Sequence, residues 1–300
     1  MRIRRECAER DILLQPPRKI LLATDLGARS DRAQDRAVSL MRRYDAELIV
    51  LHVIDKSNEA AGIRRIPFFP YRKPSERRIQ RARRQIIDYL GDAASYVKVR
   101  IEEGVPHERI LRVAVEEGCD LIVSGVARNE VLGRFIIGKT VNRLLRKFDG
   151  QMLVVTERVR SPYRGIVVLA DLSEASKRAL ETAASYFPAQ PLILLYAFAA
   201  SRSSVVDDMD AHREQMRQAA LRDLADFLNT ANLTMDQREH INMLVEFGAE
   251  SRLLSELVEA SDVELVVVGS QKHGIFLEAL LGARTKRIIS SLPCDALIVR

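Results

Sequence analysis

An internal repeat constrains the fold of this chain more than any other feature of its sequence. Residues 19–25 read KILLATD and residues 165–171 read GIVVLAD, and each apolar run ends in an aspartate. In both halves a glycine follows about 100 residues later, and a second glycine follows 13 residues after the first. These residues are Asp25, Gly125 and Gly138 in the first half and Asp171, Gly269 and Gly282 in the second. One structural unit therefore occurs twice.

Each half alternates apolar runs with segments of helical spacing. Short apolar runs without alternation are typical of strands that are buried on both faces. Strands that alternate with helices predict crossover connections and a parallel sheet covered on both sides. The sequence therefore predicts an α/β fold with two tandem doubly wound (Rossmann-like) domains, residues 17–158 and 163–300. Each domain is expected to have a five-stranded parallel sheet flanked by helices.

The ends of two strands in each half mark the expected ligand site. In doubly wound sheets, ligands bind beyond the carboxyl ends of the strands, where the winding reverses. The first strand ends at Asp25 or Asp171, and the fourth ends at Gly125 or Gly269. We expect these ends to flank a crevice in each domain.

Residues 133–140, GRFIIGKT, fit the phosphate-loop pattern G-x-x-x-x-G-K-[ST]. A working phosphate loop follows its strand directly, because its backbone N–H groups wrap the phosphates between the strand and the helix. Here the preceding strand ends at Gly125, eight residues before Gly133, and the second half keeps Gly282 without the lysine. The context therefore argues against a phosphate loop.

The strand-end aspartate, the strand-end glycine and the later glycine that opens a helix resemble the universal stress protein family. Its ATP-binding members carry G-x2-G-x9-G-[ST] after the fourth strand. The stretches ADLSEASKRALE, VVVGSQKHGIFLEALLG and SLPCDALIVR are close to family sequences, and the resemblance covers nearly the whole chain in two copies. It implies a cytoplasmic, non-catalytic regulatory module of the stress response. In such tandem members two domains form an intramolecular pseudo-dimer through their last strands, and further pairing of whole chains stays open.

The resemblance also implies which residues bind a ligand. The aspartates would face the base and ribose of ATP or AMP, with Mg accompanying the nucleotide, and the glycines would face the phosphates. The candidate residues are Asp25, Gly125, Arg128, Gly138, Lys139 and Thr140 in the first half and Asp171, Gly269, Lys272 and Gly282 in the second.

Both copies depart from the family signature at the same two positions. Arg128 and Lys272 replace its middle glycine, and Lys139 and Ala283 replace its Ser/Thr. A long side chain at a glycine position obstructs close approach of a ligand to the backbone, whereas the helix start and the added cations favour an anion. Two outcomes stay open: an altered phosphate site, or a closed crevice whose aspartates and glycines only end strands and cap helices.

A basic segment lies in the first half. The chain has a formal net charge of +6, which divides into +11 for residues 1–163 and −5 for the remainder. Residues 64–84 hold nine Arg and Lys against one acid. Ser75 is expected to cap a helix with an apolar seam and an outward cationic face. The seam is Ile79, Ala82, Ile86, Leu90 and Ala93, and the outward arginines are Arg77, Arg78, Arg81 and Arg84. The face would meet nucleic acid, an acidic partner or anionic lipid, or would only be solvated.

The sequence predicts no catalytic residue and no metal ligand. Three distant cysteines indicate buried thiols in a reducing compartment, and His52 is interpreted as a packed core residue. The acids Asp207, Asp208 and Asp210 suit the start of a helix rather than a metal. No apolar run is long enough to span a membrane. The alternative from another class is an ATP-using enzyme, an ATPase or a nucleotide hydrolase.

Overall fold

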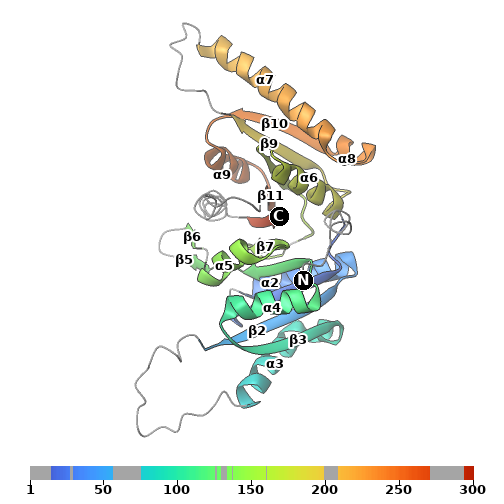
Figure 1. Ribbon diagram of the computed structural model, residues 1–300, viewed down its shortest axis with the longest axis vertical. Coiled ribbons are helices and arrows are strands. Elements are labelled where there is room, and N and C mark those ends of the chain that lie inside the picture. The colour runs from blue at the N-terminus through green and yellow to red at the C-terminus, as the bar shows by residue number, and fades with distance from the viewer. Residues whose placement is uncertain are drawn as a thin grey trace, which may run out of the picture. The chain divides into compact units, whose positions relative to one another are not determined.

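The structure is a computed structural model in which the chain divides into two compact units, one of residues 17–128 and 136–159 and the other mainly of residues 160–300 (Figure 1). It describes residues 15–27, 30–56, 76–125, 127–129, 134–136, 138–159, 161–198, 209–270 and 294–300.

The first unit contains a five-stranded parallel sheet. Its strands in chain order are β1 (Lys19–Thr24), β2 (Glu47–Asp55), β3 (Val97–Gly104), β4 (Leu121–Gly125) and β7 (Gln151–Val155). They lie in the order β3-β2-β1-β4-β7, and every neighbouring pair is parallel. The direction of winding reverses at β1, because β2 lies on one side of it and β4 on the other.

The second unit repeats this sheet strand for strand. Its strands are β8 (Ile166–Ala170), β9 (Leu192–Phe198), β10 (Ile241–Phe247), β11 (Leu265–Gly269) and β12 (Asp295–Val299). Their order is β10-β9-β8-β11-β12, again with parallel pairs throughout. The predicted fold class, two doubly wound units with five parallel strands each, is confirmed.

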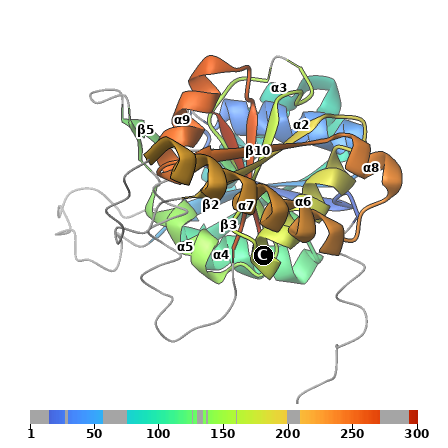
Figure 2. The same cartoon turned by 90° about the horizontal axis from the view of Figure 1, so that it is seen from above.

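Helices cover both faces of the first sheet. Figure 2 shows α2 (Asp31–Tyr44) and α3 (Glu76–Leu90) on one side, and α4 (Pro106–Glu117) and α5 (Lys139–Lys147) on the other. A short 3₁₀ helix, η1 (Gly91–Tyr96), follows α3. The apolar face of each helix is the face that packs on the sheet. In α3 the buried residues are Ala82, Ile86 and Leu90, which belong to the apolar seam that the sequence predicted.

The second unit has α6 (Glu174–Tyr186), α7 (Met209–Thr230), α8 (Met235–Glu239) and α9 (Glu250–Ala260). Leu254 and Val258 of α9 pack with Val266 and Val268 of β11 in a buried cluster that includes Cys294. The helix expected after Gly282 lies outside the described residues. None of the helices within the described ranges is long and apolar enough to cross a membrane.

The start of α6 depends on its N-cap residue, Ser173. The Ser173 hydroxyl oxygen accepts a hydrogen bond from the Ser176 N–H at 3.2 Å, and it donates to Asp171. We expect Ser173→Ala to lower the free energy of unfolding by about 1 kcal/mol, because an N–H at the helix start loses its acceptor. Urea denaturation measures this loss. Ser173→Thr, which keeps the hydroxyl, should retain most of the stability, and equal losses in the two variants would contradict the capping role.

Candidate functional site

Asp25 forms a tight turn at the carboxyl end of β1. Its Oδ1 accepts hydrogen bonds from the Gly27 N–H at 2.9 Å and from the Ser30 hydroxyl at 2.5 Å. Between them Leu26 adopts φ 61°, in the left-handed region. The Asp25 residue is exposed, and its Oδ2 has no hydrogen-bond partner among the described residues. Asp25 therefore shapes the turn through one oxygen and leaves the other for a ligand.

Asp171 builds the equivalent turn after β8. Its Oδ1 accepts from both the N–H and the hydroxyl of Ser173, at 3.1 and 2.5 Å. Leu172 follows with φ 59°, almost the value at Leu26. The repeat thus extends to the backbone conformation of this turn. In both units the aspartate has a structural role of its own, as one of the two sequence interpretations expected.

The first and fourth strands of each unit are direct neighbours, as predicted. Ala23 of β1 pairs with Ser124 of β4, and Leu169 of β8 pairs with Val268 of β11. Because the strands are parallel, Asp25 and Gly125 leave the first sheet at one edge, and Asp171 and Gly269 leave the second in the same way.

Gly269 has a packing reason to be glycine. A Cβ at this position would lie 2.2 Å from the carbonyl oxygen of Ala175 and 2.6 Å from the backbone nitrogen of Ser176. The first turn of α6 therefore approaches the end of β11 so closely that no side chain fits. This close approach explains why residue 269 is glycine, and no bound phosphate is needed for the explanation.

Gly138 differs from Gly269 in having no close neighbour among the described residues. It is the N-cap of α5 with φ −59°, and a Cβ there would meet no atom of the described residues within 4 Å. No side chain caps the first turn of α5, so its N–H groups and the positive end of the helix dipole stay available to an anion. Lys139 is exposed and Thr140 is half-buried beside it.

The phosphate-loop pattern does not adopt the conformation of a phosphate loop. Arg134–Ile136 form a strand, β6, which pairs with β5 (Ala127–Asn129) in a separate two-stranded sheet. Three of the residues that would have to wrap a phosphate are thus extended. This small sheet was not expected from the sequence.

His52 lies next to the candidate site rather than in the core, where its place in an apolar run had put it. Its Nδ1 lies 3.0 Å from the Thr24 carbonyl oxygen, so the ring donates from Nδ1 to the residue before Asp25. His52 is half-buried rather than packed in the core, because it stands near the end of β2 where the helices cover the sheet less. In the parallel register of β1 and β2, His52 pairs with Thr24, the residue before Asp25. Aligning the two apolar runs as parallel neighbours could therefore have placed His52 beside the site.

Tyr196 occupies the matching place in the second unit, opposite Ala170. It is also half-buried. Burial raises the pKa of its hydroxyl, and the nearby carboxylates of Asp223 and Asp171 raise it further. The phenol therefore stays protonated at neutral pH and can donate a hydrogen bond at this end of the sheet.

Several predicted residues lie outside the described part of the chain. They are Lys272, Gly282, Ala283, Cys7, Ser75, Asp207 and Asp208, together with the side chains of Arg128 and Asp210. Among the residues that are described, no three His, Cys, Asp or Glu side chains gather as a metal site. Burial raises the pKa of the Cys119 thiol to about 12, which keeps it protonated and unreactive.

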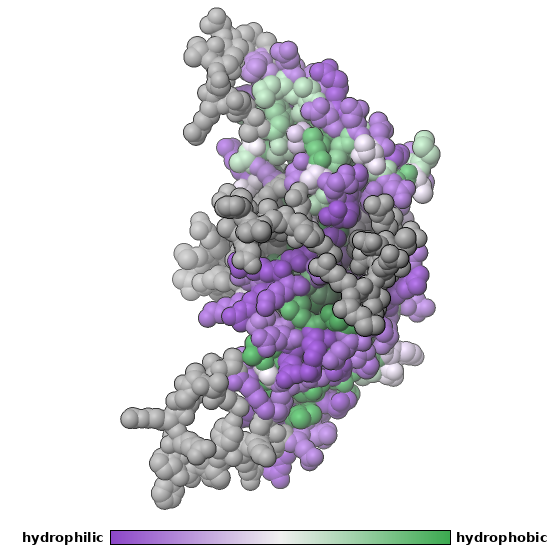
Figure 3. Space-filling model, in the orientation of Figure 1, coloured by the Kyte–Doolittle hydropathy of each residue, from purple (hydrophilic) through white to green (hydrophobic). Residues whose placement is uncertain are grey.

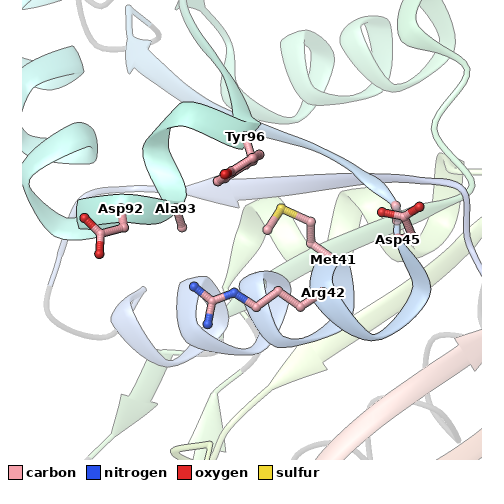
Figure 4. Close-up of a pocket in the computed structure, with 7 residues that line it drawn as sticks. Met41, Arg42, Asp45, Asp92, Ala93 and Tyr96 are labelled. Carbon is pink, nitrogen blue, oxygen red and sulfur yellow. The ribbon is translucent and has the colours of Figure 1, made fainter.

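A pocket of about 500 Å³ lies elsewhere in the first unit (Figure 4). Its lining comes from the end of α2, the residues that follow it, and η1: Met41, Arg42, Asp45, Ala46, Asp92, Ala93 and Tyr96. Because α2 ends where β2 begins and η1 ends where β3 begins, this pocket lies at the amino ends of the strands. It is therefore at the opposite edge of the sheet from Asp25.

The duplicated sheet, the paired ends of the first and fourth strands and the repeated aspartate turn define the candidate site. The model of the universal stress protein family matches residues 17–156 and again residues 162–300. The chain belongs to the universal stress protein family. The two matches agree with a tandem member that carries two family domains.

Known universal stress proteins resemble this chain in one or both domains. A curated protein of that description from Staphylococcus epidermidis is 27% identical over 160 residues, which cover 52% of this chain and 95% of the relative. A universal stress protein structure from Archaeoglobus fulgidus covers 96% of this chain and 98% of its own, with 16% identity and a TM-score of 0.66. The latter likeness shows the fold alone.

A universal stress protein solved in complex with cAMP is also similar to one half of this chain. It is 22% identical, covers 47% of this chain and 98% of its own, and has a TM-score of 0.35. A universal stress protein is thus known with a bound nucleotide, but the similarity is too low to transfer that ligand to this chain.

Proposed function

We propose that this universal stress protein is a non-catalytic regulatory module that binds an adenine nucleotide or a phosphate anion in its first unit. The ligand binds at the carboxyl ends of β1 and β4, with its phosphate at the start of α5. The base and ribose lie toward Asp25, and Arg128, Lys139 and Thr140 surround the phosphate with Gly125.

The uncapped start of α5 at Gly138 is the observation that carries this proposal. Free N–H groups and a positive dipole end attract an anion without help from side chains. No atom of the described residues lies within 4 Å of a Cβ placed at Gly138, and this space would let a ligand approach the backbone closely. Asp25 supports the orientation, because its Oδ2 is an acceptor for ribose or base hydrogens, with no partner among the described residues.

The second unit has less evidence for a ligand site than the first. Its Asp171 turn matches that of the first unit, but Gly269 is already accounted for by the contact with α6. The second unit acts first as the pseudo-dimer partner of the first within one cytoplasmic chain. Lys272 and Gly282, which lie outside the described residues, are the corresponding candidates for an anion in that unit.

Calorimetric titration of the full chain with ATP, AMP and inorganic phosphate tests the proposed site. All three ligands are expected to bind. Gly138→Leu fills the open space and should weaken all three by at least about tenfold, as expected when about 1.4 kcal/mol of helix-start interaction is lost. Asp25→Asn keeps an oxygen for the turn but removes the charge. It should weaken ATP and AMP and leave phosphate unchanged.

Arg146→Leu is the matched control for the leucine substitution. Arg146 is exposed in the last turn of the same helix, so this variant should bind all three ligands like the unmodified chain. The absence of binding, with or without Arg128→Gly, would contradict the proposal and favour closed crevices. Saturable ATP hydrolysis that Lys139→Ala and Thr140→Ala abolish would favour the rival enzyme instead.

A further inference from the structure

The outer face of α3 carries a regular row of arginines. Arg77, Arg81 and Arg84 follow the spacing i, i+4, i+7, which places them on one side of a helix. All three are exposed, and the side opposite them holds the buried Ala82 and Ile86. The row, called here the arginine stripe, extends over about 10 Å at 1.5 Å per residue.

The arginine stripe is not neutralised within the described structure. Neither Arg77, Arg81 nor Arg84 forms an ion pair with any residue in the described ranges, and the same is true of the neighbouring Arg78 and Arg83. Glu76 and Asp88 are the two acids of the helix, against five arginines. Like charges so close together repel one another, and a polyanion that neutralises them is favoured electrostatically.

Three exposed arginines on other helices are paired with acids. Arg112 of α4 lies 2.8 Å from Glu102, Arg217 of α7 lies 3.1 Å from Glu214, and Arg252 of α9 lies 2.7 Å from Glu256. Figure 3 shows that hydrophilic residues cover much of the visible described surface. Within the described ranges, Arg42, Arg146 and Arg222 are also exposed without an ion pair, but each stands on a different helix. The stripe is distinguished because three such arginines lie in one row on one helix.

We propose that the arginine stripe docks on the phosphodiester backbone of duplex nucleic acid without reading its sequence. Guanidinium groups bind phosphate oxygens in pairs, and all five cations of α3 are arginine rather than lysine. A duplex presents phosphates in regular rows, and α3 presents its arginines in a row. Contacts between arginines and phosphates are electrostatic and do not depend on the base sequence.

The chemistry of α3 favours duplex nucleic acid over other polyanions. A membrane surface would require the apolar face of α3 to insert, but Ala82, Ile86 and Leu90 are buried in the unit. Single strands are held by stacking on aromatic rings. The one aromatic residue of α3, Tyr89, is 42% exposed, and its hydroxyl is bound to Asp35 at 3.2 Å and to the Asp31 carbonyl. An acidic protein would need a matching row of carboxylates, whereas every duplex carries the row of phosphates.

Binding of the full chain to a fluorescent DNA duplex of about 20 base pairs, measured over a range of salt concentrations, tests this proposal. The unmodified chain should bind weakly at physiological salt and more tightly as salt falls. The triple variant Arg77→Gln, Arg81→Gln, Arg84→Gln removes three phosphate contacts. The slope of log K against log salt is negative, and this variant should make it less steep by about 2 to 3, at about 0.9 for each lost contact.

A second triple variant, Arg112→Gln, Arg217→Gln, Arg252→Gln, is the matched control. It makes the same change in net charge at exposed arginines that are already ion-paired, and it should leave the slope nearly unchanged. An equal loss of steepness in both variants, an unchanged slope in the stripe variant, or no binding of the duplex would overturn the proposal. Stripe-dependent binding to polyglutamate or to phosphatidylglycerol vesicles, but not to the duplex, would overturn it also and would assign another partner.

Discussion

Replacing Gly269 with alanine is expected to destabilise the second unit by about 3 kcal/mol, the upper part of the range for overpacked sites. The new methyl group would meet the backbone of Ala175 and Ser176, at 2.2 and 2.6 Å, rather than a flexible side chain. Either α6 must move away from β11 or the strand end must bend. Hydrogen exchange followed by mass spectrometry should show faster exchange in peptides that contain β8 and β11.

Gly138→Ala is the matched control within the same family signature. The added methyl group meets no atom of the described part of the chain within 4 Å and φ is −59°, so alanine fits the backbone. The expected loss is below about 1 kcal/mol, from the poorer N-cap alone. If Gly269→Ala were as stable as Gly138→Ala, α6 would not approach β11 as closely as the structure has it, and the packing explanation for Gly269 would fail.

The elements of both sheets could be predicted from the sequence because buried parallel strands have an unambiguous pattern. β1 and β8 are buried almost throughout, and their apolar runs cannot be placed on a solvated face. The repeat doubled this information, since each weak signal occurs twice with the same spacing. The arrangement of β1 between β2 and β4 follows from the fold class.

Short elements escaped prediction because their stability comes from tertiary context. β5 and β6 have three residues each, too few for periodicity to show. α8 has five residues, but it did carry a local signal: Thr234 and Gln237 form a capping box. This pattern was present in the sequence as TMDQ and could have located the helix.

The candidate site could be placed but not interpreted from the sequence. The strand ends at Asp25 and Gly125 followed from the fold class, whereas the double hydrogen bond of Asp25 to Gly27 and Ser30 depends on a left-handed Leu26. The difference between Gly138 and Gly269 is likewise a matter of what surrounds each glycine. Two glycines of the same family motif are therefore required for different physical reasons, or not required by packing at all.

Tyr163→Phe is expected to cost the second unit about 1.5 to 3 kcal/mol, the contribution of a hydrogen bond to a charged group. The Tyr163 hydroxyl donates to Oδ2 of Asp295, the first residue of β12, and the two residues are 2% and 0% exposed. Phenylalanine keeps the edge-on contact with Phe187, whose ring centroid lies 5.8 Å away. The loss therefore reports the hydrogen bond rather than the packing.

A double-mutant cycle separates this bond from other effects of the substitutions. Asp295→Asn removes the charge, and Tyr163→Phe should then cost less in its presence, because the buried acceptor is no longer a carboxylate. Tyr96→Phe serves as the control for loss of a phenol, since Tyr96 is 77% exposed, and it should leave stability unchanged. Hydrogen exchange of β12 provides the local readout. Additive losses in the cycle would mean that Tyr163 and Asp295 act independently, and their hydrogen bond would then not hold the segment before β8 to β12.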